Sequence, residues 1–164
     1  MSKTYEDIAD LAPDLADYRP LVGLDLGTKT IGVACSDIRR SVATPVETIR
    51  RTKFTKDAEA LIALATERDA AGFVLGLPRN MDGSEGPRAQ STRSFARNLG
   101  RLIDLPIVFW DERLSTVAVE RTLIEADSSR KRRAEVVDKM AAAFILQGAL
   151  DRLAVIDAAS EADQ

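Results

Sequence analysis

The chain has 164 residues, of which 45% are hydrophobic and 30% charged, which suits a single globular domain with a buried core. Its 23 Lys and Arg against 26 Asp and Glu leave a net charge of −3, which excludes a wholly basic nucleic-acid binder but not a local basic surface. Histidine is absent and Cys35 is the single cysteine, so histidine catalysis, histidine-ligated zinc and an internal disulfide are excluded.

The two ends of the chain differ in composition from its middle. Residues 1–19 are acidic and carry no strong strand pattern, so we expect a loosely ordered extension or a short docking helix that ends at Pro20. We expect one domain over residues 20–153 and a tail over residues 154–164. No apolar run approaches the ~20 residues of a membrane span, and no signal-peptide pattern opens the chain, so we expect a cytoplasmic protein without membrane contact.

The first half of the domain predicts strands followed by a helix. Apolar runs at 21–27 and 30–35, separated by a short turn, predict a hairpin. A third strand over 41–49 contains Pro45, which favours an edge position. Ala58, Leu61, Ile62 and Ala65 have helical spacing within 55–69, and a buried strand at 72–77 stops at Pro78.

The second half alternates helices with one strand. A polar loop over 80–87 precedes a helix whose expected core face is Phe95, Leu99 and Leu102. A strand follows at 106–110, then helices near 115–126 and 134–152, joined by a basic loop at 129–133. The order predicts an α/β domain with a mixed five-stranded sheet and helices on both faces.

Three acids stand in or beside apolar segments. Asp25 interrupts the first strand, where its neighbours Leu24 and Leu26 point to the opposite face. Glu112 follows the strand that ends at Trp110, and Asp138 lies in a helix that is apolar nearly all round. A buried carboxylate without a partner costs several kcal/mol, so such positions usually have a reason.

Each acid also has a structural interpretation. Asp25 could cap the turn at Gly27, and Glu112 could belong to a solvated turn. Asp138 could form an ion pair with Lys139, or it could lie exposed in the first turn of its helix, where the helix dipole stabilises a negative charge. Together, the three could meet at one edge of the sheet. Three carboxylates without histidine suit one or two Mg²⁺ or Mn²⁺ ions, which can activate water for phosphodiester cleavage.

Basic residues gather in four clusters that could hold a phosphate backbone. Arg93, Arg97 and Arg101 recur every four residues along one helix face. The other clusters lie at 39–40, 50–56 and 130–133. We expect phosphate contacts from one set of residues: Lys29, Arg79, Arg93, Arg97, Arg113, Arg130, Lys131 and Arg132. Aromatic residues make up 5% of the chain, so recognition would rest on backbone and shape rather than stacking.

Four segments resemble the YqgF-type (RuvX) family: LDLGTKTIGVACSD at 24–37, GLPRNMDGS at 76–84, DERLST at 111–116 and VDKMAA at 137–142. The resemblance spans residues 20–153 and implies a ribonuclease H-like fold. It also implies nuclease activity, described for this family on pre-16S rRNA and on Holliday junctions, with Asp25, Glu112 and Asp138 as metal-binding catalytic acids. The segment 76–83 resembles the family's substrate-side loop. Thr30 departs from the family, because many members carry arginine there.

Other functions fit parts of the sequence. The segment 25–30 also resembles the phosphate-binding hairpin of actin-like ATPases, but one domain of this length cannot form their two-domain cleft. A non-catalytic RNA-binding factor in ribosome assembly is a second alternative, and Holliday junction resolution is a third. The expected partners are nucleic acid and the small ribosomal subunit precursor, with the chain acting as a monomer or, for paired cuts, as a homodimer.

Overall fold

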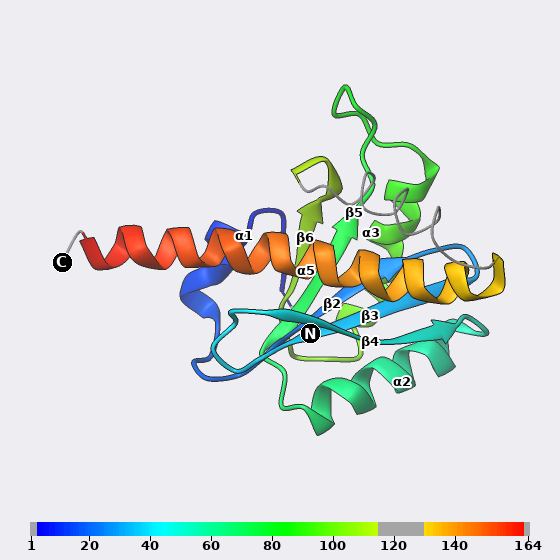
Figure 1. Ribbon diagram of the computed structural model, residues 1–164, viewed down its shortest axis with the longest axis horizontal. Coiled ribbons are helices and arrows are strands. Elements are labelled where there is room, and N and C mark those ends of the chain that lie inside the picture. Colours follow the sequence, from blue (N-terminus) through cyan, green and yellow to red (C-terminus); the bar gives the residue numbers. More distant parts are fainter. Residues whose placement is uncertain (1–2, 115–129, 163–164) are drawn as a thin grey trace.

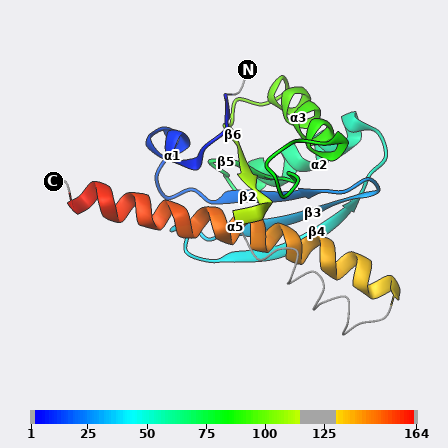
Figure 2. The same ribbon diagram turned by 90° about the horizontal axis from the view of Figure 1, so that it is seen from above.

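Six strands form one mixed sheet in the computed structural model, which describes residues 3–114 and 130–162, with the backbone alone over 130–136. The sheet order is β1-β6-β5-β2-β3-β4. Figures 1 and 2 show α5 lying along one face of the sheet and α2 and α3 covering the other. The strands are β1 (Thr4–Tyr5), β2 (Leu21–Leu26), β3 (Thr30–Ser36), β4 (Ala43–Arg50), β5 (Gly72–Leu77) and β6 (Ile107–Asp111). The helices are α1 (Ile8–Leu11), α2 (Phe54–Glu67), α3 (Pro87–Gly100) and α5 (Arg130–Ala162), with 3-10 turns η1 (Ala12–Asp14) and η2 (Glu112–Leu114).

The antiparallel half of the sheet consists of β2, β3 and β4. The predicted hairpin is confirmed, with β2 and β3 paired from Val22–Cys35 to Leu26–Ile31. β4 is the edge strand, as Pro45 predicts, and the pairing register shifts between Val33 and Ala34 on β3. Proline lacks the N–H that an inner strand would need, so this segment fits the edge.

The parallel half of the sheet consists of β2, β5, β6 and β1. The carboxyl ends of these strands meet at one edge of the sheet, where α/β folds usually hold their ligands. Two apolar layers hold the sheet. The layer under α2 and α3 includes Leu24, Leu26 and Phe95, and the layer under α5 includes Val74 and Leu146.

The N-terminal segment contains the short docking helix that was one of the two expectations, although α1 ends at Leu11 rather than at Pro20, and it is not a loose extension. Thr4 and Tyr5 add β1 beside β6, which makes the sheet six-stranded rather than five-stranded. Ile8 and Leu11 are buried in the layer under α5, and the Tyr5 hydroxyl donates to Asp14 at 2.5 Å. Accepting that bond, the Asp14 carboxylate raises the pKa of Tyr5. Burial of two apolar side chains orders a segment that its acidic composition alone would leave loose.

The C-terminal part of the chain also differs from expectation. α5 begins at Arg130, so residues 130–133 of the expected basic loop are helical, and the helix continues into the expected tail as far as Ala162. Leu102 lies beyond the end of α3 and is 55% exposed, so it does not extend the core face of Phe95 and Leu99. The helix expected near 115–126 lies outside the described residues. None of the described helices is both long enough and apolar enough to pass through a membrane.

Candidate active site at the carboxyl edge of the sheet

Asp25 is a buried acid inside a strand, with 5% of its surface exposed. Because Leu24 and Leu26 point into the layer under α2 and α3, Asp25 points toward α5, as the alternation of the strand predicts. Asp25 pairs with Gly32 on β3. The pair Leu24–Leu75 joins β2 to β5, so the next residue on β5, Gly76, lies on the other side of Asp25. Asp25 therefore has a glycine on each side.

Those two glycines make room for the other two acids. A Cβ atom at Gly32 would lie 1.9 Å from the carbonyl oxygen of Asp138, so the backbone of α5 rests directly on β3 there. A Cβ atom at Gly76 would lie 2.4 Å from Cδ1 of Ile145 and 2.7 Å from Oε1 of Glu112, so an α5 side chain and this carboxylate both lie against β5. The row Gly32–Asp25–Gly76 thus brings Asp138 and Glu112 to opposite sides of Asp25.

Thr30 connects Asp138 to the sheet. Its Oγ1 donates a hydrogen bond of 2.5 Å to Oδ2 of Asp138, between residues 108 positions apart in the chain. The alternative of an Asp138–Lys139 ion pair is absent from the described part of the chain. The contact holds the carboxylate of α5 at the start of β3, beside the carboxyl end of β2.

The donor set at this edge fits a hard cation. Asp25, Glu112 and Asp138 offer carboxylate oxygens, which Mg²⁺ and Mn²⁺ prefer. Within the part of the chain that the structure describes, however, no three acidic, cysteine or histidine side chains are grouped closely enough to hold a metal ion. The fold brings the three acids to one row, and the Asp138 carboxylate is turned toward Thr30.

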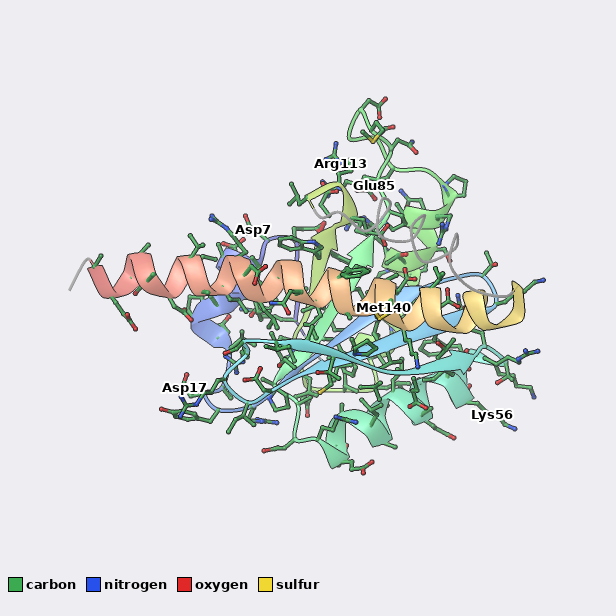
Figure 3. All side chains as sticks on the ribbon, in the orientation of Figure 1. Asp7, Asp17, Lys56, Glu85, Arg113 and Met140 are labelled. Atoms are coloured by element: carbon green, nitrogen blue, oxygen red, sulfur yellow. The ribbon has the colours of Figure 1, made fainter. Side chains whose placement is uncertain are left out.

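Two of the expected phosphate-binding arginines are engaged in ion pairs. Arg113 donates to Asp111 at 2.7 Å, and Arg79 lies 3.7 Å from Asp111 and 3.6 Å from Glu85. The Arg113 hydrogen bond lowers the pKa of Asp111. Figure 3 shows Arg113 and Glu85 close together at the base of the loop between β5 and α3. These arginines hold the loop 78–86 against β6.

Arg93 is engaged more strongly. Its guanidinium forms a two-point contact with Glu85, at 2.6 and 2.8 Å, and lies 2.5 Å from Glu6. The same group lies 4.9 Å from the ring centre of Phe109. Arg93 therefore connects α3 to the loop 78–86 and to the N-terminal segment. Of the expected stripe Arg93, Arg97 and Arg101, Arg93 is already neutralised by two carboxylates.

Replacing Arg93 by methionine is expected to lower the melting temperature at neutral pH, with a smaller effect in acid. The Arg93 hydrogen bond holds the pKa of Glu85 below its ordinary value of 4.5. A lowered carboxylate pKa stabilises the fold above the unfolded-state value, and this contribution is lost as pH falls through the folded-state value. When thermal unfolding is measured from pH 7 to pH 3, the difference in melting temperature between Arg93→Met and wild type should therefore become smaller below about pH 4.5.

Arg97→Met is the matched control, because the side chain of the exposed Arg97 hydrogen-bonds to Ser94 and forms no ion pair with a described residue. It should change the melting temperature little at any pH. An Arg93→Met difference that stays constant down to pH 3 would contradict the role assigned to the Glu85 pair.

The remaining expected cations have separate positions. Lys29 is exposed in the turn between β2 and β3, and Arg97 is exposed on α3. The side chains of Arg130, Lys131 and Arg132 lie outside the described residues. Their phosphate contacts stay a prediction.

Sequence reasoning missed the residues that shape the site. No structural role was expected for Thr30, Gly32 or Gly76. Thr30 hydrogen-bonds to Asp138, and the two glycines leave space for Asp138 and Glu112 to lie against the sheet. Glycine within a strand often marks the close approach of another backbone, so a close contact at Gly32 and Gly76 could have been predicted from the sequence. The contact of Thr30 could not be predicted in this way, because its partner lies on a distant helix.

Comparisons with known proteins agree with the fold. The family model described as "RuvX: Holliday junction resolvase" matches residues 19–152. A Roseobacter denitrificans protein named "Putative pre-16S rRNA nuclease" is 66% identical over 161 residues, covering 97% of this chain and 98% of that protein. A protein of the same name from Paracoccus denitrificans is 67% identical over 148 residues, covering 90% and 94%.

One solved structure shares the architecture at low identity. The RuvC of T. thermophilus, in complex with a Holliday junction substrate, superposes with a TM-score of 0.53 at 8% identity. The match covers 83% of this chain and 96% of that chain. The expected ribonuclease H-like fold is confirmed.

Proposed function

Because the chain belongs to the RuvX family, we propose that it is a metal-dependent nuclease that hydrolyses phosphodiester bonds of pre-16S rRNA, at its 5′ end, during assembly of the small ribosomal subunit. The observation that carries the proposal is the row Gly32–Asp25–Gly76, where two glycines admit Asp138 and Glu112 beside a buried carboxylate. A structural protein has little reason to gather three acids at the ligand-binding edge of an α/β sheet.

In this proposal, the acidic residues would bind the metal and basic residues would position the RNA strand. Asp25, fixed by the sheet, Glu112, lying over Gly76, and Asp138, oriented by Thr30, would hold one or two Mg²⁺ or Mn²⁺ ions. A bound divalent ion supplies Lewis-acid stabilisation of the phosphate and lowers the pKa of its water. The burial of Asp25 fixes its position, so little reorganisation is needed when substrate arrives. Exposed Lys29 and Arg97 would position the strand.

The test is cleavage of end-labelled RNA that spans the leader and the mature 5′ end of 16S rRNA. With Mg²⁺ or Mn²⁺, the protein should produce discrete cuts. EDTA should abolish them, and an excess of Mn²⁺ over the chelator should restore them. Activity that persists in EDTA would contradict the metal-dependent mechanism. If this RNA is bound but stays intact in every metal, either cleavage requires a ribosomal partner or the chain is a non-catalytic assembly factor.

A four-way DNA junction is the second substrate, because the matching family model is described as a Holliday junction resolvase. Paired symmetric nicks in a mobile junction, with the RNA left intact, would favour resolution over rRNA processing. Two symmetric cuts require two active sites, so this outcome also requires a homodimer. Cuts in the RNA alone are the expected result, and they fit a cytoplasmic protein that acts on ribosomal precursors as a monomer or dimer.

A further inference from the structure

A small polar pocket of about 290 Å³ lies beside the candidate active site, lined by Thr30, Thr48, Arg50 and Lys139. The strand register explains the grouping. Thr30 pairs with Arg50 and Gly32 with Thr48, so these positions share one face of β3 and β4. Lys139 comes from α5, one residue after Asp138, whose carbonyl lies over Gly32. Three elements therefore build the pocket at a fixed place.

The lining of this pocket is suited to an anion. Arg50 and Lys139 are cationic, and the lining includes no carboxylate. Neither cation forms an ion pair with a residue that the structure describes. This contrasts with Arg79, Arg93 and Arg113, which are paired with acids around the loop 78–86. The charge of the pocket is thus available to a ligand.

The pocket and the candidate site share a residue. Thr30 lines the pocket and also donates to Asp138. An extended polyanion with one phosphate at the three acids would therefore pass over this pocket when it runs toward β4. Resting on the proposed nuclease function, we propose that the pocket holds a backbone phosphate of the bound strand next to the scissile one, with Arg50 and Lys139 as its ligands.

The experiment measures binding and cleavage separately. The probe is a fluorescein-labelled single-stranded RNA of about 20 nucleotides, bound in Ca²⁺ so that it stays intact, at four salt concentrations. Arg50→Gln with Lys139→Gln should weaken binding about tenfold at moderate salt. The slope of log K against log salt should fall by about 0.7, the value for one phosphate contact of a single strand.

Arg68→Gln with Arg152→Gln is the matched control, because both residues are exposed cations that do not line the pocket and form no ion pairs with described residues. It removes the same charge and should leave both Kd and slope near wild type. Equal weakening in the two double variants would overturn the proposal in favour of general attraction. Wild-type binding in the Arg50/Lys139 variant would overturn it as well. Unchanged melting temperatures show that both variants are folded.

Two outcomes distinguish this proposal from binding of free phosphate and from the proposed nuclease function itself. If inorganic phosphate binds wild type but not the Arg50/Lys139 variant, while RNA binding is equal, the pocket takes free phosphate and the proposal is overturned. If the RNA probe binds with the expected difference in slope but the RNA spanning the leader and the 5′ end of 16S rRNA is not cut in Mg²⁺ or Mn²⁺, the subsite stands and the nuclease function fails.

Discussion

The Asp25→Asn variant is expected to cut RNA at least about a thousandfold more slowly than wild type, a loss of ~4 kcal/mol in transition-state stabilisation. Asparagine has nearly the same size but removes one of the three proposed metal-binding carboxylates. The positions beside Asp25 on the neighbouring strands are glycines, so neither of these residues carries an oxygen that could replace its carboxylate. RNA affinity measured in Ca²⁺ should change by no more than about twofold, because the basic residues remain.

A buried aspartate on the other face of the sheet provides the control. Asp57 on α2 is as deeply buried as Asp25 and accepts a hydrogen bond from the backbone of Thr52. Asp57→Asn is expected to cost some stability and leave cleavage near wild type at a temperature where the variant is folded. Full cleavage by a purified Asp25→Asn protein, free of wild-type enzyme, would refute the assignment of Asp25.

The Gly32→Ala variant is expected to lose about 1–3 kcal/mol of folding free energy together with most of its cleavage activity. The added methyl group would lie 1.9 Å from the carbonyl oxygen of Asp138. This oxygen is backbone, so it can yield only if α5 moves away from the sheet. That movement separates Asp138 from Asp25 and opens the layer under α5. The melting temperature should fall by about 2–4 °C for each kcal/mol.

Gly86→Ala separates this effect from the general cost of replacing glycine. A Cβ atom at Gly86 would meet only Asn80, at 3.9 Å, which is ordinary contact. Its φ of −94° is open to alanine, so the stability cost should be limited to placing alanine at the N-cap of α3, about 1 kcal/mol, and activity should stay close to wild type. A Gly32→Ala protein with both wild-type melting temperature and wild-type cleavage would show that α5 does not need its close contact with β3.

Local patterns were sufficient to predict most of the sheet. The alternation around Asp25 placed its side chain opposite Leu24 and Leu26, and the proline at position 45 placed its strand at the edge. These predictions depend on the period of a strand or helix, which is a property of a few neighbouring residues.

Features that depend on distant partners were not predictable in this way. β1 has two residues, too few for a strand pattern, and is held by pairing with β6 and by the burial of Ile8 and Leu11. The role of Arg93 depends on Glu6 and Glu85, which reach it from other segments. Its spacing along α3 indicated a surface stripe, because spacing does not reveal where opposite charges lie.

The two outer strands of the sheet limit how copies of this protein can associate. A long, regular outer strand can recruit a strand from another chain, which leads to continuous sheets and aggregation. Here β1 offers two residues, while β4 carries Pro45, which cannot donate a hydrogen bond, opposite an irregularity in β3. Both borders therefore discourage strand addition. A dimer that makes paired cuts would accordingly associate through helices or loops, leaving its sheets separate.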